Sequence, residues 1–79
     1  MTEQPRLRDV VAIGDQPLIA GFALAGVRLH PASSAAEVGA AWQEVFRTAA
    51  VVILTRSAAD SLGDDRAAPQ GPLTVVMPA

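Results

Sequence analysis

The chain has 79 residues, of which 51% are hydrophobic and 18% charged, so it suits one small globular domain and is too apolar for a disordered segment. Its net charge is −2, and its six basic residues are all arginines spread along the chain, which argues against nucleic acid as a partner. The absence of cysteine excludes disulfides, thiolate metal sites and cysteine nucleophiles.

The first residues and the lengths of the apolar runs indicate whether the protein is secreted or inserted in a membrane. Residues 1–8 are polar and aperiodic, unlike the apolar core of a signal peptide, and we expect a loose leader there followed by a single domain over residues 9–79. The uninterrupted apolar runs reach about five residues, far below the length of a membrane span. We therefore expect a cytoplasmic protein with no direct membrane insertion.

The first predicted unit is a strand, a turn and a helix. Val10–Ile13 is a continuous apolar run that ends at Gly14, which is typical of a strand covered on both faces of a parallel sheet. Asp15 stands where a helix N-cap belongs, and Pro17 suits the first helical turn. Gly26 is well placed to end this helix. The helical face expected to be apolar consists of Leu18, Ile19, Phe22 and Ala25.

A second strand and the clearest helix signal follow. Val27–Leu29 is a short strand candidate closed by His30 and Pro31. Ser34 and Glu37 have the spacing of a capping box, in which each side chain satisfies a free backbone N–H. The buried stripe of the helix that they open is predicted to consist of Val38, Ala41, Trp42, Val45, Phe46 and Ala49.

The last third of the chain contains two more strands. Val51–Thr55 is apolar on both faces, and Ser57 could cap a short helix through Leu62. Residues 64–72 are rich in turn formers and predict a mobile loop before a fourth strand, Leu73–Met77. Strands that alternate with helices predict an α/β fold, a small Rossmann-like domain with a four-stranded parallel sheet flanked by helices.

Ligands of open α/β sheets bind at the carboxyl ends of the strands, where this chain places few reactive groups. Gly14 and Asp15 lack the Gly-x-Gly-x-x-Gly pattern that cradles a pyrophosphate, and Asp15 is better explained as a cap. The third strand ends in Thr55 and Arg56, without the acceptor aspartate of a phosphorylated receiver domain, and the chain has no lysine.

The remaining reactive side chains form no recognisable constellation. His30 is the only histidine, which is too few for a usual zinc site, and Ser57 has no nucleophile elbow. Asp60, Asp64 and Asp65 lack the spacing of a calcium loop. From the residues alone we expect a non-enzymatic module without cofactor or metal that contacts another protein.

Two motifs in the first unit resemble the N-terminal signature of the F subunit of V-type and A-type rotary ATPases. They are Ile-Gly-Asp, which includes Gly14 and Asp15, and Gly-Phe-x-Leu-Ala-Gly, which includes Gly21, Phe22, Leu24 and Gly26. The strand up to Thr55 and the proline-flanked strand at residues 72–78 are also similar, so the resemblance covers residues 10–78. Gly21 would then let the helix pack closely on its neighbour.

The resemblance implies a non-catalytic component of a complex that couples ATP synthesis or hydrolysis to ion transport. Members bind the coiled-coil D subunit, help to form the central stalk and act indirectly on the catalytic hexamer. They continue beyond the position of Ala79 into a C-terminal helix, so only the N-terminal globular domain is matched. An alternative function is a small-ligand or nucleotide-binding domain that uses Asp15, Thr55, Arg56 and Ser57 at the strand ends.

Overall fold

The computed structural model describes residues 10–67 and 71–78, and the predicted leader at residues 1–8 lies outside them. The strands are β1 (Val10–Gly14), β2 (Arg28–Pro31), β3 (Val51–Leu54) and β4 (Leu73–Val76). The helices are α1 (Gln16–Ile19), α2 (Ala35–Val45) and α3 (Arg56–Leu62), with 3₁₀ segments η2 (Ala20–Ala25) and η3 (Gly63–Ala67). All four predicted strands are present, shifted by one or two residues.

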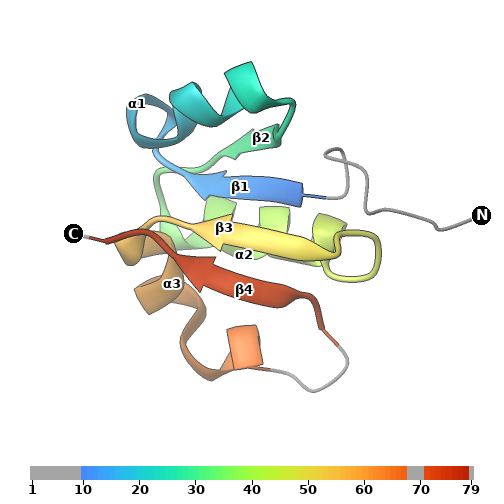
Figure 1. Ribbon diagram of the computed structural model, residues 1–79. Helices are drawn as coiled ribbons and strands as arrows, with labels where there is room; N and C mark the ends of the chain where they lie inside the picture. The colour runs from blue at the N-terminus through green and yellow to red at the C-terminus, as the bar shows by residue number, and fades with distance from the viewer. Residues whose placement is uncertain (1–9, 68–70, 79) are drawn as a thin grey trace, which may run out of the picture.

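The four strands form one parallel sheet in the order β2-β1-β3-β4 (Figure 1). Neighbouring β-branched runs pair in register, for example Val11 with Val52 and Ile53 with Val75. This confirms the predicted α/β fold with helices on both faces. The chain crosses from β1 outward to β2 and then back past β1 to β3, so the strand order reverses between β1 and β3.

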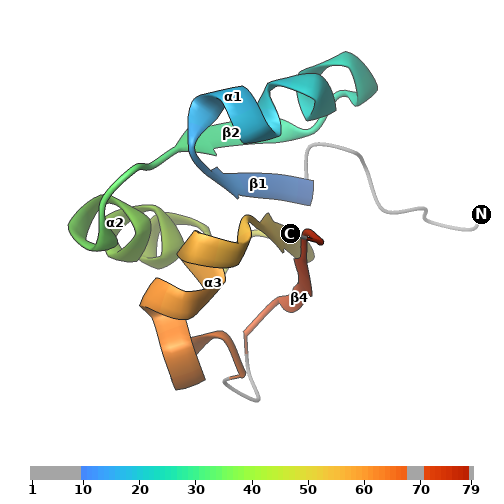
Figure 2. The same cartoon turned by 90° about the vertical axis from the view of Figure 1, so that its left-hand side faces the viewer.

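Helices lie on both faces of the sheet, but unequally (Figure 2). The helices α2 and α3 share one face and enclose the larger core, in which Val11, Val52 and Leu54 meet Trp42 and Val45. The segment α1–η2 lies over β1 and β2 on the other face, with a smaller core. That smaller core is built from Ala12, Ile19 and Val27, with Val10, Phe22, Leu29, Ile53 and Met77 packed against it.

The helix after β1 differs from the regular amphipathic helix predicted for it. Only four residues are α-helical before the chain tightens into η2, although Gly26 ends the segment in the left-handed conformation at φ 84°, as expected. Of the predicted apolar face, Ile19 is buried and Phe22 half-buried, whereas Leu18 and Ala25 are exposed. A 3₁₀ segment has three residues per turn, so the 3.6-residue periodicity assumed for this face does not hold along it.

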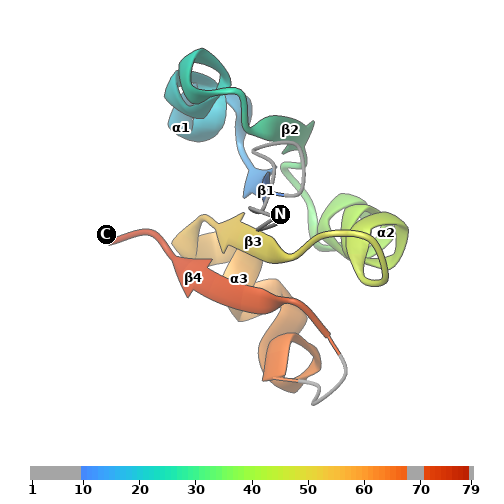
Figure 3. The same cartoon turned by 45° about the vertical axis from the view of Figure 1, so that its right-hand side comes forward.

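The region after β3 also requires corrections. The helix α3 begins at Arg56, and its N-cap is Thr55 rather than Ser57. Part of the predicted loop is the 3₁₀ segment η3, while residues 68–70 lie outside the described residues. The strand β4 forms an edge of the sheet (Figure 3). Its apolar side chains Leu73, Val75 and Val76 are exposed.

Candidate functional site

The reversal of strand order places the carboxyl ends of β1 and β3 side by side, which is where an open α/β sheet usually holds its ligand. Here the two ends are joined tightly: the Thr55 backbone N–H donates to the Ile13 carbonyl oxygen at 3.1 Å. Gly14 follows with φ 155°, and a Cβ at this position would lie 2.8 Å from the Thr55 Cβ and closer still to its Oγ1 and Cγ2. The Thr55 side chain therefore occupies the space that glycine leaves open.

The Thr55 side chain stabilises the fold and is not accessible to a ligand. Its side chain is 2% exposed, and its Oγ1 accepts a hydrogen bond from the Ala58 backbone N–H at 3.2 Å. The hydroxyl thereby caps α3 and satisfies one of the free N–H groups of its first turn. The sequence favours Ser57 because serine is a good cap. In the structure β3 ends at Leu54 and α3 begins at Arg56, so the N-cap position falls on Thr55.

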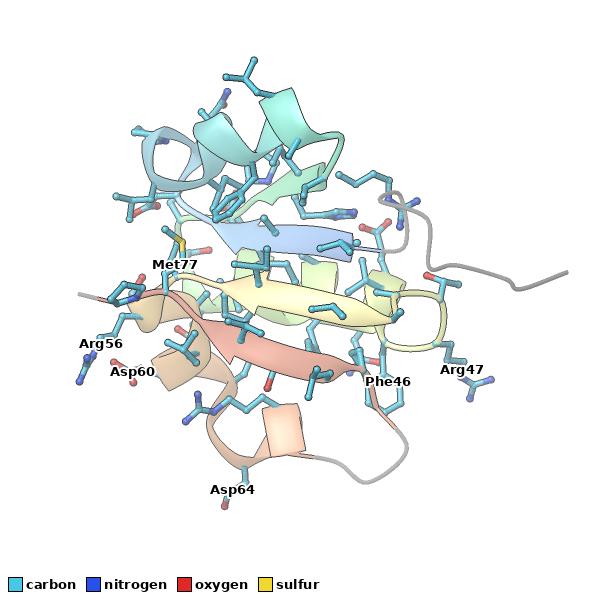
Figure 4. The ribbon with its side chains drawn as sticks, in the orientation of Figure 1. Phe46, Arg47, Arg56, Asp60, Asp64 and Met77 are labelled. Carbon is cyan, nitrogen blue, oxygen red and sulfur yellow. The ribbon has the colours of Figure 1, made fainter. Side chains whose placement is uncertain are left out.

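The other residues of the alternative ligand edge do not converge on one point. Asp15 occupies the N-cap position of α1, yet its side chain makes no capping hydrogen bond, and its carbonyl oxygen accepts from the Leu18 N–H at 2.9 Å. Arg56 and Ser57 are both exposed on the first turn of α3. Arg56 points away from the sheet (Figure 4). The arrangement does not focus charge on a common ligand.

His30 and the acidic residues give no stronger site. His30 Nδ1 lies 3.6 Å from Glu44 Oε2 on α2, with the glutamate side chain largely exposed. Asp60 lies on α3, while Asp64 and Asp65 lie on η3. Within residues 10–67 and 71–78, no three such side chains gather in a way that could hold a metal ion.

The two helix-cap residues predicted by spacing do meet. The Ser34 Oγ accepts from the Glu37 backbone N–H at 3.1 Å. The Glu37 Oε1 accepts at 2.8 Å from the N–H of Ser33, one residue before the cap, rather than from that of Ser34. The pair begins α2, whose buried stripe includes Trp42 in edge-to-face contact with Phe46, and it serves the fold rather than chemistry.

The glycine-rich motif after the first turn is mostly on the surface. Gly21 has nothing within 4 Å of where a Cβ would stand, so the expectation of a close helix contact there is wrong. Leu24 is 95% exposed on η2, whereas Phe22 is half-buried against the smaller core. Gly26 is required by its positive φ.

The comparison with protein-family models decides the identity. Residues 10–78 match the model of the ATP synthase (F/14-kDa) subunit. The chain belongs to this family. The match covers all four strands and agrees with the resemblance to the F subunit of V-type and A-type ATPases. Neither the search of curated proteins nor the search of solved structures found a significant match.

A member of the ATP synthase F-subunit family works within a complex, so its exposed apolar side chains are of interest. In the part of the chain that the structure describes, no helix is long and apolar enough to cross a membrane. The apolar side chains exposed on β4 are the feature that sequence reasoning misses, because the run Leu73–Met77 is as apolar as a buried strand. The edge position follows from the strand order of the sheet, which the local sequence does not show.

A pocket of about 320 Å³ is lined by Leu18, Gly21, Phe22 and Met77. Three of the four residues come from the α1–η2 segment, and Met77 follows the carboxyl end of β4 (Figure 4). The lining contains no charged group. This pocket and the exposed face of β4 are better suited to an apolar protein surface than to a charged small molecule.

Proposed function

We propose that this chain is a non-catalytic component of the central stalk of a V-type or A-type rotary ATPase, where it docks on the coiled-coil D subunit. The observation that carries the proposal is the family match over residues 10–78. In this role the chain transmits or supports rotation below the catalytic hexamer, while nucleotide chemistry and ion transport belong to other subunits. Its location would be cytoplasmic and peripheral to the membrane.

The use of the polar groups at the strand ends supports a binding role over a catalytic one. A catalytic hydroxyl must be within reach of both a base and a substrate. The Thr55 hydroxyl instead accepts from the Ala58 N–H and lies under the surface. The alternative of a nucleotide site at Asp15, Thr55, Arg56 and Ser57 gains no support from this geometry.

The direct test is co-expression of the chain with the coiled-coil D subunit encoded in the same genome, followed by affinity capture and size-exclusion chromatography. We expect a stoichiometric complex that withstands gel filtration. An unrelated coiled coil of similar length and net charge serves as the control and should not be captured. A chain that is folded by circular dichroism, yet fails to retain the coiled-coil partner, would contradict the proposal.

A thermal-shift experiment separates the alternative. A ligand that binds only the folded state raises the melting temperature, because it adds a stabilisation of RT ln(1 + [L]/Kd). We expect no shift with millimolar ATP, ADP or inorganic phosphate. A clear shift with any of them would favour the ligand-binding function instead.

A further inference from the structure

We draw no further inference here: the strongest candidate, the apolar face of β3 and β4 on the α1 side, where Leu73 and Val75 are exposed, is unpartnered in the residues that the structure describes, and nothing in the structure shows what covers it.

Discussion

Replacing Gly14 with alanine should destabilise the fold more than the same change at Gly21, Gly39 or Gly63, where a Cβ would meet nothing within 4 Å. Gly14 ends the central strand β1, at the point where β1 and β3 meet. An alanine Cβ would overlap Oγ1 and Cγ2 of Thr55 and approach its Cβ to 2.8 Å. Thr55 has little freedom to withdraw, because its N–H donates to Ile13 and its hydroxyl accepts from Ala58.

The expected magnitude follows from two contributions. Forcing an extra methyl into a close-packed site costs roughly 1–3 kcal/mol. Placing alanine at a positive φ costs about 1 kcal/mol more, since only glycine adopts that conformation freely. We therefore expect a loss of about 3 kcal/mol, against a total of roughly 4–12 kcal/mol for a chain of this length.

Urea denaturation followed by circular dichroism measures this loss, and a double-mutant cycle with Thr55→Ala assigns its cause. Thr55→Ala removes Oγ1 and Cγ2, the two atoms that an alanine at position 14 would meet most closely. Gly14→Ala should then cost about 1 kcal/mol less in that background than in the original chain. An equal cost in both backgrounds would refute the steric argument and leave the backbone conformation as the cause.

Three smaller effects test other parts of the fold. Gly21→Ala should raise stability by about 0.5 kcal/mol in urea denaturation, because no atom lies within 4 Å and its φ is not positive; a loss would show that a packing contact exists after all. Ser34→Ala should cost about 1 kcal/mol through the lost cap, whereas Ser33→Ala should be silent because only its backbone is used. Glu44→Gln should change stability by less than about 0.5 kcal/mol at any pH, since its contact with His30 is exposed, and a larger change would mean that the pair is stronger than its geometry implies.

Much of the architecture can be predicted because it depends on local patterns. Continuous apolar runs rich in β-branched residues, such as Val51–Leu54, are typical of buried parallel strands, and their alternation with helices limits the topology. The Ser34–Glu37 spacing fixes the start of α2 through bonds that span only a few residues. The helical stripe predicts that Trp42 lies in the core, and it is buried there.

The errors occur where a residue's role depends on contacts distant in sequence. Whether Thr55 or Ser57 caps α3 is decided by where β3 stops pairing with β1, which the local sequence does not show. Gly14 has the local pattern of a turn residue, although its position is constrained by a threonine 41 residues later in the chain (55 − 14 = 41). Analogy with helical glycines predicts a packing role for Gly21, but it lies in a 3₁₀ segment facing open space.

The carboxyl ends of β1 and β3 are filled by side chains, whereas one face of β4 is exposed to water. In an α/β fold that binds small ligands, the crevice at the strand reversal stays open and the faces are covered. Here Gly14 and Thr55 fill that crevice, while Leu73 and Val75 remain exposed on β4. A surface of this kind carries a free-energy cost in water of about 25 cal/mol per Å² of apolar area, which is recovered only when another apolar surface covers it. Among the described residues, the apolar area left in water therefore lies on the sheet face, while the strand ends are closed by the fold itself.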